Sequence, residues 1–386
     1  MPKSYRRSPK RAALIERIRS GIVSGDLPPG TQLPPRIEMV KSLSTCMHTL
    51  QGALRTLQDD GFIRSKPHEG TFVTDKPPHL SRYAFVARPD PRNDWQGFMA
   101  VLRSECAAIE KELGCEFVFR ENVTERPDTL QYQGLLDDIR AHRVAGLIFR
   151  DGPGVDDLLD SPIVTAPGVP RVVLTGNPSQ ASAGPATVSC IGGDNSLLAE
   201  RALTWLAERG RSQVAVLARG EFCESELDDF LLGAQRRGMT THPCWIHQAV
   251  YFQQGRSLTE LLMFPRPDER PDAMILMNES LIEPVGLGIL ASGVRAGSDV
   301  DIVAYSNMPC VGSPAVPMRR LGIDMRQRLR VAVRLLDRQQ RGESVPPCVL
   351  LPSVFEEELS RPPGVVGREA GPGKEQSVAA NESVRW

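Results

Sequence analysis

The chain has 386 residues, of which 41% are hydrophobic and 24% charged, the ordinary balance of a globular protein with room for two domains. Its eight cysteines stand singly, which argues against a structural zinc site and favours free thiols. The sequence has no apolar run long enough to span a membrane, and its basic N-terminus lacks the apolar stretch of a secretory signal. We therefore expect a cytoplasmic protein without a membrane partner.

The charge is divided unequally along the chain. Residues 1–80 hold 13 Lys and Arg against 7 Asp and Glu, a balance of +6, whereas the whole chain carries −1, so the remainder carries −7. A basic segment joined to an acidic one indicates that the first meets a polyanion and the second does not.

Three helices and a hairpin are predicted in the first 75 residues. Apolar residues recur at helical spacing over Leu14–Ile22, Ile37–Leu43 and Leu50–Leu57. Two short β-prone runs then follow, Gly61–Lys66 and Gly70–Asp75, which is a hairpin signal. This order of elements predicts a winged helix-turn-helix.

The stretch "SGDLPPGTQLPPRIEMVKSLSTCMHTLQGALRTLQDDGFIRSKPHEGTFV" resembles the DNA-binding domain of the GntR family, and the resemblance covers about residues 10–74. The family's structural positions are kept, namely Gly25, Leu27, Pro29, Gly30, Leu33, Pro34, Thr49, Ala53, Leu54, Leu57, Gly61, Ile63, Gly70, Thr71, Phe72 and Val73.

The positions that meet DNA in that family are mostly replaced. Three arginines of the family pattern fall at Ile37, Met47 and Gln51, and the serine that caps the third helix falls at Cys46. In the wing, His68 stands for the first glycine and Glu69 for the usual basic residue. The fold and the contact chemistry are therefore separate questions.

The replacements still allow base reading. Methionine can pack on a thymine methyl group, and glutamine can pair with the N6/N7 edge of adenine. We expect Met47, His48 and Gln51 to read bases, while basic side chains hold phosphates. The phosphate-holding side chains include Arg64 and an N-terminal arm with Lys3, Lys10 and Arg11. The expected DNA-binding residues are Arg6, Arg7, Arg36, Lys41, Met47, His48, Thr49, Gln51, Arg55, Lys66 and His68.

Beyond a Pro-containing linker at 76–81, apolar strands alternate with amphipathic helices. Strands are expected at 82–87, 115–120, 144–150, 170–176, 212–218, 272–277 and 299–306, and helices at 94–113, 130–142, 194–210, 224–237 and 279–292. This alternation predicts parallel α/β sheets covered on both faces. About 280 residues indicate two lobes with a ligand cleft between them. The tail at 361–386 is expected to be disordered.

Three segments resemble the sensor domain of LacI/GalR-type regulators. They are "DNSLLAERALTWLAERGRSQVAVLA", "PDAMILMNESLIEPVGLGILASGVRAGSDVDIVAYSNMP" and the segment Met318–Ser360. The resemblance as a whole covers roughly residues 82–360. The resemblance implies a type-I periplasmic-binding-protein-like sensor, and its fusion to a GntR-type reader is the layout of arabinose-repressor-like regulators.

The ligand positions of that family are also altered. Its Asn-Asp pair appears as Asn278-Glu279, and the final Asp of its I-V-G-F-D run appears as Ser306, followed by Asn307. The effector-binding residues that the resemblance implies are Asp94, Trp95, Arg150, Asp151, Glu226, Asn278, Glu279 and Asn307. Trp95 is expected to stack on a sugar ring, whereas Trp205, Phe98 and Met99 are expected in the core and Asp194 as a helix cap.

We expect no enzyme, metal or cofactor. The sequence has no G-x-S-x-G, P-loop, H-E-x-x-H or dinucleotide-binding motif, and residues 112–373 contain no lysine, which excludes an aminotransferase-like domain. The sequence predicts a homodimeric repressor that binds a double-stranded operator and responds to a small effector, with a sugar as one candidate. The alternative is a ligand- or partner-binding scaffold whose winged helix has lost specific DNA reading.

Overall fold

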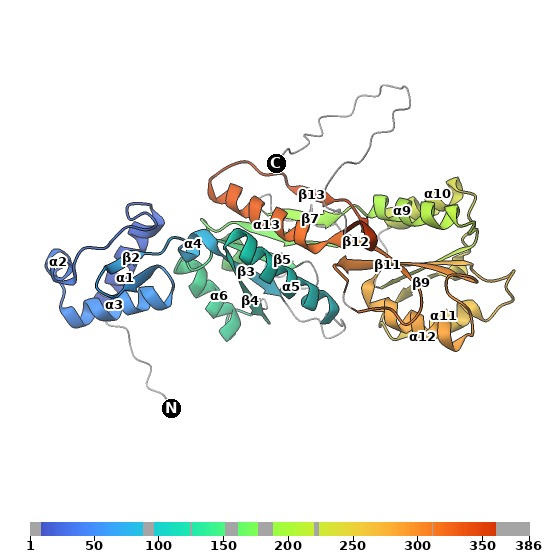
Figure 1. The fold of residues 1–386 in the computed structure, drawn as a ribbon, viewed down its shortest axis with the longest axis horizontal. Coiled ribbons are helices and arrows are strands. Elements are labelled where there is room, and N and C mark those ends of the chain that lie inside the picture. Colours follow the sequence, from blue (N-terminus) through green and yellow to red (C-terminus); the bar gives the residue numbers. More distant parts are fainter. Residues whose placement is uncertain are drawn as a thin grey trace, which may run out of the picture.

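The computed structural model describes residues 9–87, 96–123, 126–150, 161–176, 188–219, 224–310 and 312–359. These residues form three bodies in a row, with the N-terminal helices at one end, an α/β lobe in the middle and a second α/β lobe at the far end (Figure 1). The tail at 361–386 and the expected helix start at Asp94 lie outside the described residues.

The N-terminal body is a winged helix-turn-helix, as the sequence predicts. Its elements are α1 (Pro9–Val23), α2 (Arg36–Ser42), α3 (Met47–Asp59), β1 (Ile63–Lys66) and β2 (Gly70–Val73). The apolar residues that set the helical spacing form its buried core, which includes Leu14, Ile15, Ile18, Ile22, Leu50, Ala53, Leu54, Leu57, Phe62 and Val73. Local periodicity therefore identifies both the helices and their buried faces.

The wing is a short antiparallel hairpin that the preceding loop braces. Ile63 pairs with Val73 at its base, and Gln32 Nε2 donates to the main-chain oxygen of Glu69 at 2.7 Å near its tip. His68 has a φ of +62°, a left-handed conformation that favours glycine. This left-handed backbone explains why the family has glycine at the position of His68.

The linker predicted at 76–81 contains a short helix, α4 (Pro78–Ser81). Pro78 and His79 are buried in it, and Figure 1 shows α4 between the winged helix and the middle lobe. The segment is thus a packed connection, because its prolines and His79 are covered by both neighbouring bodies.

The middle lobe, called lobe 1 here, is a six-stranded parallel sheet with helices on both faces. Its strands, in sheet order, are β13 (Cys348–Leu351), β7 (Ser189–Gly193), β6 (Arg171–Leu174), β5 (Gly146–Arg150), β3 (Arg82–Ala87) and β4 (Glu116–Glu121). Its helices are α5 (Gln96–Leu113), α6 (Leu130–Arg140), α7 (Pro162–Thr165) and α13 (Met325–Gln340).

The far lobe, lobe 2, repeats this architecture. Its strands, in sheet order, are β14 (Val354–Phe355), β12 (Arg319–Asp324), β11 (Asp301–Met308), β10 (Ala273–Leu276), β8 (Val214–Arg219) and β9 (Ile246–Ala249), with β14 antiparallel to β12. Its helices are α9 (Asn195–Glu208), α10 (Glu224–Arg236), α11 (Gln254–Met263), α12 (Ile282–Ala291) and α14 (Glu356–Leu359), with 3₁₀ turns η2 (Pro243–Trp245) and η3 (Glu279–Leu281).

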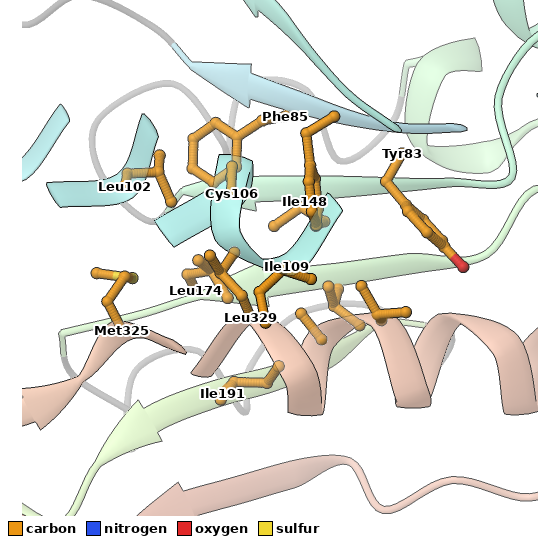
Figure 2. Close-up of a cluster of buried hydrophobic side chains, with 14 of the residues drawn as sticks. Tyr83, Phe85, Leu102, Cys106, Ile109, Ile148, Leu174, Ile191, Met325 and Leu329 are labelled. Carbon is orange, nitrogen blue, oxygen red and sulfur yellow. The ribbon is translucent and has the colours of Figure 1, made fainter. Parts of the chain in front are cut away.

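Each lobe buries one apolar cluster on either face of its sheet. In lobe 1, Phe85 and Ile148 of the sheet meet Leu102 of α5 and Leu329 of α13 (Figure 2). Helix α13 follows β12 of lobe 2 yet packs on lobe 1, so the chain crosses between the lobes and ties them together. In the described part of the chain, every helix is too short or too polar to cross a membrane.

The predicted parallel α/β pattern is confirmed, with some elements missed. The helix expected at 279–292 is divided into η3 and α12, and β7, β9 and α11 were not predicted from the sequence. Strand β7 reads SCIGG, which is a poor strand by composition. Tertiary packing explains the glycine at position 193, because a β-carbon there would lie 2.7 Å from Ile323 Cδ1.

Candidate nucleic-acid interface and effector site

Helix α3 presents an exposed face opposite its buried one. Leu50, Ala53, Leu54 and Leu57 are buried, whereas Met47, His48, Gln51 and Arg55 are exposed. The exposed set recurs at helical spacing from the first turn, so the predicted reading residues lie together on one surface of the helix. Thr49 is half-buried between the two faces.

Cys46 occupies the N-cap of α3 without capping it. Its backbone is extended, with φ −100° and ψ 157°, and it makes no side-chain cap hydrogen bond. Its Sγ instead lies 3.1 Å from Thr49 Oγ1, a contact that holds the pKa of the Cys46 thiol below its ordinary value. The first-turn amides therefore lack the acceptor that a serine N-cap would supply.

The basic residues of the winged helix divide into two groups. Among the described residues, Arg36, Lys41 and Arg55 are exposed and form no ion pair. Lys66 pairs with Glu69 across the wing at 3.1 Å, so part of its charge is neutralised. His68 is exposed at the wing tip, and Arg6 and Arg7 lie outside the described residues.

Arg11 differs from the expectation that it belongs to a phosphate-binding arm before the first helix. Lys10 and Arg11 belong to α1, which begins at Pro9, rather than to a segment before it. The Arg11 guanidinium donates to the main-chain oxygen of Gly52 at 2.7 Å and to Thr56 Oγ1 at 3.0 Å. These two bonds tie α1 to α3 and engage Nη2 of Arg11 within the domain.

In lobe 1, the predicted effector residue Arg150 ends strand β5. Its guanidinium lies over the ring of Phe98, 4.5 Å from the ring centroid, in the geometry of a cation–π contact. Phe98 also packs against the apolar cluster of lobe 1, as expected of a core residue. Asp94, Trp95 and Asp151 lie outside the described residues.

In lobe 2, Glu279 and Asn307 are joined directly. Glu279 Oε2 accepts from Asn307 Nδ2 at 2.7 Å and from the Asn307 main-chain N–H at 3.2 Å. Asn278, by contrast, turns its side-chain oxygen to the main-chain N–H and the hydroxyl of Ser280, at 3.0 and 2.7 Å. That oxygen caps the 3₁₀ turn that holds Glu279 in place.

Glu279 also reaches lobe 1. Its Oε1 lies 3.3 Å from the position that a β-carbon on Gly97 would occupy. Gly97 is in the first turn of α5, where a carboxylate is favoured by the helix dipole. Since Phe98 is the next residue, the contact brings Glu279 and Asn307 of lobe 2 to the part of α5 that also holds Arg150.

Tyr305 is a neighbour that was not among the residues predicted for the site. Its hydroxyl donates to Asn307 Oδ1 at 3.4 Å, and burial raises its pKa while the charges of Arg328, Glu279 and Arg150 also act on it. The available signal was its place near the carboxyl end of a parallel strand, where such folds bind ligands. Glu226 lies in the first turn of α10, and its side chain is outside the described part of the chain.

One predicted structural role is present as expected. Asp194 Oδ1 accepts from the main-chain N–H of Leu197 at 2.9 Å, so Asp194 caps α9. Asn195 donates from Nδ2 to the main-chain oxygen of Gly176 at 3.1 Å, which ties the start of α9 in lobe 2 to the end of β6 in lobe 1.

Comparison with known proteins assigns the two parts separately. Residues 10–73 match the model of the family described as bacterial regulatory proteins, gntR family. No curated protein matches the chain by sequence.

Solved structures resemble the rest of the chain. A regulatory protein of the LacI family from Chloroflexus aggregans has 18% sequence identity and a TM-score of 0.56, over 71% of this chain and 96% of its own. A LacI family transcriptional regulator from Bifidobacterium animalis subsp. lactis DSM 10140 has 18% identity and a TM-score of 0.54, over 71% and 95%. The lac repressor dimer bound to operator and the anti-inducer ONPF has 18% identity and a TM-score of 0.53, over 71% and 92%.

At these identities the structural matches establish the fold of the sensor, while the family model identifies the N-terminal domain. The chain therefore joins a GntR-family DNA-binding domain at residues 10–73 to a two-lobed domain with the fold of LacI-family regulators.

Proposed function

We propose that the protein is a ligand-responsive transcriptional repressor of the cytoplasm, with no catalytic activity. Residues 1–75 form the domain that binds DNA, and residues 76–81 link it to the sensor. The sensor, residues 82–360, binds a small effector between its two lobes. The observation that carries this proposal is the exposed face of α3 on a GntR-family domain, joined to a sensor fold that LacI-family regulators share.

At the DNA, we assign two roles to two kinds of side chain. Met47, His48 and Gln51 read base edges in the major groove, since all three are exposed on α3 and suit apolar or amide contacts. Phosphates are held by basic residues flanking this face, with Thr49 and the wing tip beside them. The phosphate-binding set comprises Arg6, Arg7, Arg36, Lys41, Arg55, Lys66 and His68.

At the effector site, we assign the centre to Arg150, Glu279 and Asn307. These groups come from both lobes and combine positive, negative and amide hydrogen-bonding capacity, which suits a polar effector such as a sugar. Its surroundings would be completed by Asp94, Trp95, Asp151, Glu226 and Asn278. An effector that displaces Glu279 from α5 changes how the lobes meet, and DNA affinity must then respond reciprocally.

We propose a homodimer that pairs through the outer faces of α11 and α12. Leu261, Phe264, Leu287 and Leu290, on or next to these helices, are 69%, 90%, 41% and 57% exposed, and a second copy of the chain would cover them. One of the similar solved structures is the lac repressor, which is described as a dimer bound to operator. A two-fold dimer would present two recognition helices to two half-sites.

A gel-shift titration with the upstream region of its own gene, at two salt concentrations, tests the proposal. Arg55→Ala should weaken binding to all sequences alike and flatten the salt dependence. Gln51→Ala should relax the preference at one A·T position, by about 1–3 kcal/mol. Equal loss on every sequence for Gln51→Ala refutes its role as a reader.

One observation favours the alternative, a scaffold that no longer reads DNA. Ile37, at a position where the family has arginine, is 66% exposed, so the DNA face has lost charge without becoming buried. Absence of any specific shift at low salt would contradict the regulator. We favour the regulator because Arg36, Lys41 and Arg55 remain unpaired on this face within the described chain.

A further inference from the structure

Asp60 lies at the junction between the winged helix and lobe 1. It is the C-cap residue of α3, and its carboxylate meets an arginine from each side: Arg19 Nη2 of α1 at 3.0 Å and Arg143 Nη1 of lobe 1 at 3.6 Å. Its main-chain oxygen also accepts from Arg82 Nη1 at 3.3 Å. The end of the recognition helix is therefore held by both bodies.

The ion pairs continue into lobe 1 with alternating sign. Arg143 Nε bonds Asp138 Oδ1 at 2.8 Å, and Asp138 Oδ2 accepts from Arg120 Nε at 2.9 Å. The side chains of Arg19, Asp60, Arg143 and Asp138 are only 6%, 15%, 21% and 8% exposed. Such shielded pairs resist screening, and removing one partner leaves an uncompensated charge in a poorly hydrated site.

Apolar packing accompanies these charges. The ring of Phe62 lies parallel to that of His79, with centroids 6.0 Å apart and an interplanar angle of 13°. A β-carbon on Gly61, whose φ is +89°, would lie 3.4 Å from Pro78 Cγ, so the two backbones approach closely there. Gln340 of α13 donates to the main-chain oxygen of His79, which fixes α4 on lobe 1.

The same segment of lobe 1 reaches the effector site. Arg143 shortly precedes β5, and Arg150 is the last residue of β5 (Gly146–Arg150). The strand thus connects the arginine that holds α3 to the arginine that lies beside Phe98. Strand β5 is paired with β3 and β6 on its two sides, so both contacts lie on one strand in the interior of the sheet.

We infer that the winged helix is docked on lobe 1 through the Asp60–Arg143 contact, and that this contact couples the orientation of α3 to the sensor. The regulatory part of this inference rests on the proposed function, whereas the docking itself does not. A flexible tether would transmit effector binding only weakly, because the reader would reorient independently of the lobes.

The test is hydrogen exchange on the full chain, without DNA or effector, for Arg143→Gln. The expected result is exchange at least about tenfold faster in the amides around Phe62 and His79, since about 1.4 kcal/mol of lost docking free energy gives a tenfold change. The amides of Leu50–Leu57 should keep their protection, which shows that the winged helix remains folded. The matched control is Arg103→Gln, which breaks a pair of exposed side chains with Glu121 in the same lobe.

Unchanged exchange around Phe62 and His79 in Arg143→Gln, or an equal change in Arg103→Gln, would overturn the docking. Asp60→Asn and the double variant Asp60→Asn/Arg143→Gln complete a double-mutant cycle. If the two substitutions change the exchange rates independently, so that the coupling ratio is one, the docking is also overturned. A gel shift with the gene's own upstream DNA then tests the regulatory part separately. Arg143→Gln should alter DNA affinity although residue 143 lies in the sensor, and an affinity equal to wild type would contradict the coupling while leaving DNA binding itself intact.

Discussion

Acidification should release the winged helix from lobe 1 through a single histidine. His79 is 7% exposed and packs on Phe62, and its Nδ1 is buried with no hydrogen-bond partner among the described residues. Burial, and secondarily the charge of His142, lower the pKa of His79 from 6.5 to about 4.

The sign and size of the effect follow from linkage. A group with a depressed pKa contributes stability that is fully present above pH 6.5 and is lost as the pH falls toward 4, because the undocked histidine takes up a proton that the docked one refuses. Between pH 7.5 and pH 5 the loss amounts to about 2 kcal/mol, enough to reduce the docked population roughly thirtyfold relative to the undocked one.

Urea unfolding of the wild type and of His79→Phe at both pH values measures this loss. The phenylalanine keeps a ring against Phe62 but cannot titrate, so carboxylates that protonate in both proteins cancel in the difference. The wild type should lose about 2 kcal/mol more than the variant. Equal losses, or a His79 pKa near 6.5 by NMR titration, would show that the ring is not buried in the docked protein.

Further predictions concern local packing and capping. Gly288→Ala should destabilise lobe 2 by about 1–3 kcal/mol, because its β-carbon would lie 2.7 Å from the main-chain oxygen of Arg256. Gly134→Ala is the control, since among the described residues outside its own helix no atom lies within 4 Å of its β-carbon position. It should stabilise α6 by about 0.5–1 kcal/mol, and thermal unfolding measures both variants. Cys46→Ser should add a side-chain cap to α3 and raise the unfolding free energy of the winged helix by about 0.5–1 kcal/mol; a decrease would mean that the Sγ contact with Thr49 stabilises the helix more than a cap does.

Local sequence signals predicted the architecture well. The spacing of Leu50, Leu54 and Leu57 identified α3 and its buried face, because helix periodicity depends only on neighbours in the chain. Apolar strands alternating with amphipathic helices likewise predicted two parallel sheets. Elements with weak local signals were missed, as in β7, where Gly193 leaves room for the side chain of Ile323.

The candidate sites were harder to predict, because a side chain's role depends on partners distant in sequence. Arg11 carries the same charge as Arg55, yet it binds the main chain of α3 while Arg55 stays exposed. Asn278 and Glu279 are adjacent, but one caps its own turn and the other crosses to α5. Residue type alone could not separate these roles.

The sequence by itself determined the winged helix, the α/β sensor and the exposure of Met47 and Gln51 on α3, since each follows from short-range periodicity and turn chemistry. Only the tertiary structure decided which charges remain available to ligands and which hold bodies together. Asp60 and Arg143 show why: each reads as an ordinary surface charge in its own segment, and the fold shields both by bringing α3 against lobe 1.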